Sequence, residues 1–121
     1  MTVNAEHNAT RAQLNTYRAA TARLVAALDA HNAARACYDH AKDAHEDARR
    51  ALLLDGVPGV PERATSAVQE AAMTRATDAQ ARALRAAREA LRAAETELEA
   101  ARVLERAERE VLRVVTVDAT E

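Results

Sequence analysis

The chain has 121 residues, the size of one domain, and a formal charge of −2. Almost half of it is hydrophobic, but most of that is alanine; Trp and Phe are absent, and Tyr17 and Tyr38 are the only aromatic residues. This composition excludes a thick globular core, because buried methylene groups contribute about 0.8 kcal/mol each and alanine has few to bury. It is typical of long helices or a coiled coil, and the small net charge gives no general attraction to nucleic acid or membrane.

A first long helix is predicted over residues 5–54, a stretch without glycine or proline. Its larger side chains recur at alternating spacings of three and four, which is the pattern of a coiled-coil seam. The stripe comprises Thr10, Leu14, Tyr17, Thr21, Leu24, Leu28, His31, Ala34, Tyr38, Ala41, His45, Ala48 and Leu52. A break near Asp29–Asn32 would instead give a four-helix bundle, and this is the architectural alternative.

A turn is predicted over residues 55–60, because residues 55–61 hold every glycine and proline of the chain. Gly56 can take the left-handed conformation that closes a helix, and Pro61 is tolerated as the first residue of the next helix. So short a connection forces the two helices to run antiparallel. Reflection about Val57 and Pro58 places Leu24 opposite Leu91.

A second long helix is predicted over residues 61–114, and a cap at Ser66 would move its start one turn later. Its clearest stripe is followed by a less regular one, and together they comprise Leu84, Ala87, Leu91, Ala94, Leu98, Ala101, Leu104, Ala107, Val111 and Val114. The remaining tail, residues 115–121, is rich in β-branched residues that favour extended backbone. It is expected to be a loose end or a strand that adds to a partner's sheet.

The predicted fold is therefore all-α: one domain over residues 1–121, formed by two long antiparallel helices in a coiled-coil-like hairpin. In length and topology the chain resembles the small secreted helical hairpins of the WXG type. The Trp-x-Gly of that family is absent, because the turn here is Asp55-Gly56-Val57-Pro58-Gly59. The resemblance implies the topology alone.

Two groups of residues are candidates for contacts with other molecules. Three consecutive leucines cannot all face one partner helix, so some should meet another surface. The apolar candidates at the turn and the tail are Leu52, Leu53, Leu54, Val57, Val60, Val114, Val115 and Val117. The second group is basic and is the candidate for contact with an anionic partner. It lacks interleaved aromatic residues and therefore argues only weakly for nucleic acid. It comprises Arg75, Arg82, Arg85, Arg88 and Arg92.

Enzyme motifs are absent, and a two-helix hairpin is expected to lack the concave pocket that catalysis needs. Cys37 and His40 share a helix face, but two ligands do not make a transition-metal site. No cofactor or metal is therefore predicted. The polar N-terminus predicts no signal peptide, and no apolar run approaches the about 20 residues of a membrane span. We expect a cytoplasmic or virion location.

The pattern favours a non-catalytic structural or interaction subunit, bound to copies of itself or to a larger assembly. Ordering two helices around a thin seam costs about 1–2 kcal/mol of backbone entropy per residue, which docking would help to offset. Lys42 is the only lysine among many arginines, a composition that suggests a bacteriophage virion or prophage component from a GC-rich host. The alternatives are a small adaptor that binds a cellular protein through the turn or a helix face, and a nucleic-acid-associated helical protein that uses the arginine group.

Overall fold

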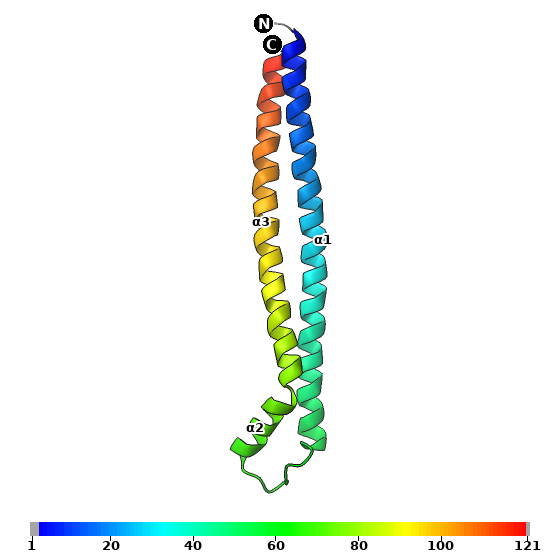
Figure 1. Ribbon diagram of the computed structural model, residues 1–121, viewed down its shortest axis with the longest axis vertical. Helices are drawn as coiled ribbons and strands as arrows, with labels where there is room; N and C mark the ends of the chain where they lie inside the picture. The colour runs from blue at the N-terminus through cyan, green and yellow to red at the C-terminus, as the bar shows by residue number, and fades with distance from the viewer. Residues whose placement is uncertain (1–2, 121) are drawn as a thin grey trace. The chain divides into compact units, whose positions relative to one another are not determined.

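The computed structural model describes the backbone of residues 3–120, and it is all-α over that range, with α1 (Val3–Asp55), α2 (Ser66–Ala76) and α3 (Asp78–Thr120). The two long helices, α1 and α3, pack against each other as in a helical hairpin (Figure 1). The predicted all-α hairpin is confirmed in this respect. Because α1 is continuous through Asp29–Asn32, the four-helix alternative is wrong.

The chain forms two compact units, which we describe separately. The first, which we call the seam region, comprises residues 3–32 of α1 and 93–120 of α3 in the described part of the chain. The second, which we call the turn region, comprises residues 33–92 and therefore contains the end of α1, the connection, α2 and the start of α3.

In the seam region, small residues allow α1 and α3 to approach each other closely. Ala27, Leu98 and Ala101 form a buried cluster against which Leu24 packs. Three polar pairs connect α1 with α3 across the seam: Gln13 with Glu108, Tyr17 with Glu105 and Arg23 with Glu97. Residue numbers rise along α1 while those of the partners on α3 fall, which shows that the two helices run antiparallel here.

The pairing of the helices differs from simple reflection about Val57 and Pro58. Leu24 packs against the cluster that contains Leu98, and not against Leu91. The pairing is thus shifted by about two helical turns along α3. The reason is the connection, which runs from Gly56 to Thr65 and moves the point of reversal later in the chain.

The buried stripe follows the prediction on most of α1 and on α3 from Leu84 to Ala101. On α1, however, Ala27 is buried where the prediction has Leu28, which is exposed. On the last third of α3 the predicted Val111 and Val114 are also exposed. Leu104 is half-buried as predicted, but the other half-buried positions there are Glu105, Glu108, Leu112 and Val115. Two glutamates occupy the seam because they accept hydrogen bonds from Gln13 and Tyr17.

In the turn region, α1 ends where the sequence predicts. Gly56 has a φ of 82°, and its N–H donates to the carbonyl of Leu52 at 2.9 Å, which satisfies one of the last carbonyls of the helix. A tight turn follows, in which the N–H of Val60 donates to the carbonyl of Val57 at 3.1 Å. Pro58 and Gly59 occupy its centre, and the φ of 80° at Gly59 is what a type II turn requires.

The second predicted helix, residues 61–114, begins later than Pro61 and is interrupted. The N–H of Ala64 donates to the carbonyl of Pro61, so these residues form a turn. Thr65 caps α2 by accepting a hydrogen bond from the N–H of Val68 at 3.3 Å. Gln69 then donates to the carbonyls of Glu62 and Ala64, at 3.1 and 3.0 Å, and holds the turn against the helix.

The interruption lies at Thr77, which separates α2 from α3 and is only 1% exposed. Its hydroxyl donates to the carbonyl of Met73 at 2.9 Å, as does its own N–H at 3.0 Å. A threonine can bend a helix in this way. Thr16 and Thr21 make the same bond within the continuous α1, however, so this bond alone does not explain the interruption. Asp78 then starts α3, where a carboxylate is favoured by the helix N-terminus, and forms an ion pair with Arg82.

The extended tail predicted over residues 115–121 is also wrong for its described part, because α3 continues to Thr120. Residue 121 lies outside the described residues. Leu112 and Val115 are half-buried on the seam side of α3, so packing outweighs the β-propensity of the valines. Residues 3–120 contain no β-strand.

Candidate protein-docking site in the turn region

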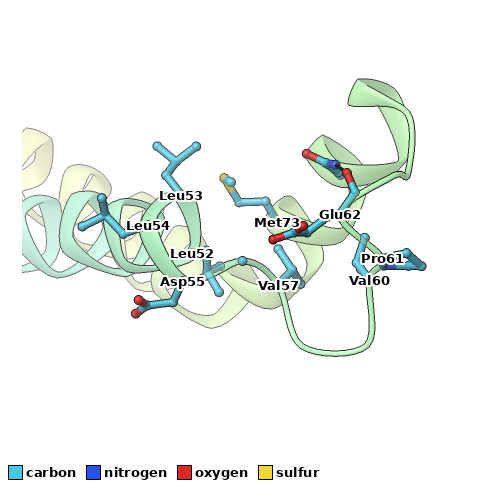
Figure 2. A pocket seen from close by; sticks show the side chains of 11 residues that line it. Leu52, Leu53, Leu54, Asp55, Val57, Val60, Pro61, Glu62 and Met73 are labelled. Carbon is cyan, nitrogen blue, oxygen red and sulfur yellow. Dashed lines mark hydrogen bonds between the residues drawn. The ribbon is translucent and has the colours of Figure 1, made fainter.

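An open pocket of about 510 Å³ lies between the end of α1, the connection and α2 (Figure 2). This volume falls within the range of about 300–1,000 Å³ that is usual for binding sites. Five of the apolar residues singled out from the sequence come together in its lining. The lining comprises Leu52, Leu53, Leu54, Asp55, Gly56, Val57, Val60, Pro61, Glu62, Gln69 and Met73.

The apolar side chains of this site differ in exposure. Leu52, Val57 and Val60 are half-buried and Met73 is buried, so they form the inner part of the pocket. Leu53 and Leu54 are 71% and 79% exposed. Both leucines stand on the end of α1, at the edge of the pocket that they help to line (Figure 2). Helix geometry explains the difference, because successive residues point about 100° apart and only one of three can face α2 or α3.

Local structure holds the pocket open. Gly56 turns the chain away from α1, the turn centred on Pro58 and Gly59 reverses it, and Gln69 fastens the following residues to α2. Across the same region, Arg49 of α1 forms an ion pair with Glu70 of α2 at 2.8 Å. The walls of the pocket therefore come from segments that are tied together by hydrogen bonds and an ion pair.

The pocket forms because α2 departs from the direction of a single long second helix, and it is open to solvent (Figure 1). The lining nevertheless has no serine, threonine, cysteine, histidine or lysine. Asp55 and Glu62 are its only ionisable residues. The arrangement can hold an apolar side chain, but it offers no nucleophile activated by a neighbouring base.

The other predicted apolar candidates lie in the seam region, far along the sequence from the pocket. Val114 and Val117 are on the exposed side of α3, and Val115 is half-buried in the seam. Val114 and Val117 are three residues apart and share one face of α3, whereas Val115 lies on the seam side. The structure thus separates the eight apolar candidates into five at the pocket and three on α3.

The basic candidates are all exposed but belong to two helices. Arg75 lies on α2, before the interruption at Thr77, whereas Arg82, Arg85, Arg88 and Arg92 lie on α3. Arg82 forms an ion pair with Asp78. The interruption therefore divides the group that the sequence presents as one run.

Cys37 is an exposed free thiol. Among the residues whose side chains the structure describes, no three histidine, cysteine, aspartate or glutamate side chains gather closely enough to hold a metal ion. No helix within the described range combines the length and the apolar character that crossing a bilayer demands.

The sequence pointed to Glu62 as an acidic residue beside the turn and to Gln69 as the partner of a cap at Ser66, but it gave no role to Met73. The hydrogen bond from the side chain of Gln69 to the carbonyl of Glu62 is seen only in the structure. The size of Met73 could have marked it as a buried residue, because it is the largest apolar side chain of that segment and stands four residues before Thr77. Comparison with known proteins adds no assignment, because no family model, no curated protein and no solved structure matches the chain.

Proposed function

We propose that the chain is a non-catalytic subunit that binds other proteins, in a larger assembly, through the turn region. The observation that carries the proposal is the exposure of Leu53 and Leu54 at a pocket whose inner part is formed by Leu52, Val57, Val60 and Met73. Burying a leucine side chain contributes about 1.5–3 kcal/mol, so two neighbouring exposed leucines represent an appreciable gain on docking. Large exposed apolar patches on proteins are usually sites of association.

The same observation favours the adaptor alternative, in which the turn binds one copy of a cellular protein. The two versions differ in stoichiometry: an assembly subunit occurs in a fixed number of copies, and an adaptor forms a one-to-one complex. The finer proposal of a bacteriophage virion or prophage component is supported by composition, with arginine in large excess over lysine. Presence of the chain in purified particles would be its direct test.

The experiment is a native mass measurement of the chain alone and of the complexes isolated with it from its source. We expect a defined complex that is lost in the double variant Leu53→Ser, Leu54→Ser and retained in the control Val25→Ser. Val25 is a suitable control because it is also exposed, at 52%, but lies on α1 in the seam region. Circular dichroism would verify that both variants remain helical. A chain that stays monomeric and uncomplexed, or complexes that persist in the double variant, would contradict the proposal.

A further inference from the structure

The charge around the pocket is of one sign. Asp55 and Glu62 are its only ionisable residues, and neither carboxylate forms an ion pair or hydrogen bond with another residue of the described chain. The end of α1 adds to this, because a helix C-terminus carries a partial negative charge and the last turn of α1 holds no basic residue. The pocket is thus bordered by two carboxylates that have no ion-pair partner among the described side chains.

One of the two carboxylates lies over the pocket itself. Figure 2 shows the side chain of Glu62 extending toward Met73 and Val57, whereas that of Asp55 points away at the end of α1. The backbone of Glu62 is held in two ways: its carbonyl accepts a hydrogen bond from the side chain of Gln69, and it lies within the turn closed between Pro61 and Ala64. The carboxylate is therefore positioned next to apolar side chains while remaining exposed to solvent.

We propose that the pocket binds a segment of a partner protein in which a bulky apolar side chain stands next to a lysine or arginine. The apolar side chain fills the space between Leu52, Val57 and Met73, and the cation meets the carboxylate of Glu62. This inference rests on the proposed function and specifies the chemistry of the partner. Recognition of this kind takes its affinity from the apolar anchor and its selectivity from the charge.

A second copy of the same turn is a poorer occupant on electrostatic grounds. A two-fold symmetric contact brings the same patch of two subunits together. Here it would place Asp55 and Glu62 of one copy against the same carboxylates of the other. Like charges in close contact suppress association, so the pocket favours a different, basic partner.

The test is a selection of short random peptides, displayed on yeast, for binding to the intact chain. Enriched peptides are then compared by fluorescence anisotropy on the wild type, Glu62→Lys, Val57→Asp and the control Glu99→Lys. Glu99 is an exposed glutamate of α3 in the seam region, so its variant changes the net charge equally without touching the pocket. A peptide in which the basic residue is replaced by glutamate completes the set.

We expect enriched peptides to carry a large apolar residue beside a basic one. Glu62→Lys should weaken their binding by about fivefold or more, since an exposed ion pair is replaced by a repulsion. It should also improve binding of the glutamate-substituted peptide. Val57→Asp should weaken binding of both peptides, and Glu99→Lys should change neither.

Absence of enrichment, enrichment without basic residues, or equal binding to Glu62→Lys and wild type would overturn the inference. Association of the chain with itself that is lost in Glu62→Lys would also overturn it, by identifying a second copy as the occupant. The proposed function would survive those results as long as the native complexes still depend on Leu53 and Leu54.

Discussion

The two regions of the molecule use their apolar side chains differently. In the seam region, Leu98 and its alanine neighbours are buried between α1 and α3. In the turn region, Leu53, Leu54 and Val68 remain on the surface, and only Met73 is buried among the large apolar residues. Both regions leave apolar side chains on the surface, but those of the seam region are 37–54% exposed, whereas Leu53 and Leu54 of the turn region are 71% and 79% exposed. The two leucines are therefore the large apolar side chains of the described chain with the most surface left for other contacts.

Polar contacts show the same division. The seam region has three polar pairs that connect α1 with α3, whereas in the turn region Arg49 and Glu70 form the one ion pair that connects α1 with a later helix among the described side chains. Polar groups in a helical seam fix the alignment of the helices at some cost in stability. Side chains of the seam region therefore set the alignment of the helices, whereas the surface at which we propose that partners dock belongs to the turn region.

The largest expected effect comes from truncating the buried leucine of the seam. Leu98 is 5% exposed and contacts Ala27 and Ala101, so Leu98→Ala should lower the free energy of unfolding by about 2 kcal/mol or more. Leu53→Ala is the matched control in the turn region, and its exposed side chain predicts a change within about 0.5 kcal/mol. Urea unfolding followed by circular dichroism measures both. Equal losses in the two variants would break the comparison.

The next effect comes from the glycines of the turn. Gly56 and Gly59 have φ values of 82° and 80°, and an added methyl group would meet no atom within 4 Å at either position. The cost of Gly56→Ala or Gly59→Ala is then conformational alone, about 1–2 kcal/mol each. Asparagine tolerates this conformation better, so Gly59→Asn should cost less than Gly59→Ala in the same unfolding measurement. An alanine without effect would show that the turn adopts another conformation in solution.

Sequence reasoning could place the first helix, its end at Gly56 and most of the seam, because these depend on local propensity and on apolar periodicity. It could not place Thr77, since a threonine without neighbouring glycine or proline gives no recognised signal of a break. It also missed Glu105 and Glu108 in the seam, because a glutamate interrupts the apolar pattern unless its partner on the other helix is known.

The candidate site was foreseen in part for similar reasons. Three consecutive leucines exceed what one seam can bury, so exposure of some of them followed from helix geometry. The pocket itself depends on α2, whose start at Thr65 and end at Thr77 are set by side-chain hydrogen bonds to the backbone. Threonines also occur inside regular helices, as Thr16 and Thr21 do in α1, so the sequence does not distinguish the two uses.

A smaller effect is expected from the tyrosine of the seam. The hydroxyl of Tyr17 donates to Oε1 of Glu105 at 3.0 Å, so Tyr17→Phe should lower the free energy of unfolding by about 1 kcal/mol. Tyr38 is also half-buried but lies in the turn region, and its hydroxyl has no hydrogen-bond partner among the described residues. Tyr38→Phe should therefore be close to neutral. If Tyr38→Phe lowered the free energy of unfolding more than Tyr17→Phe does, polar contacts of the turn region, and not those of the seam region, would set the alignment of the helices.

The smallest effect concerns pH and the exposed pair of Arg23 and Glu97. The guanidinium of Arg23 donates a hydrogen bond at 2.7 Å, and this bond, with the attraction of the two charges, holds the pKa of Glu97 below its ordinary value. A carboxyl whose pKa is lower in the folded state stabilises the fold above its unfolded pKa, about 4.3, and loses that contribution as pH falls through the folded pKa.

The wild type should therefore melt at a slightly higher temperature than Glu97→Gln between pH 5 and 7, with the difference shrinking below about pH 4. Glu99→Gln is the matched control, because Glu99 has no ion-pair partner among the described side chains, and it should follow the wild type at every pH. The Glu110–Arg113 pair titrates alike in all three proteins and cancels from the comparison. A difference between wild type and Glu97→Gln that persists unchanged at pH 3 would mean that packing, and not charge, carries this contact of the seam.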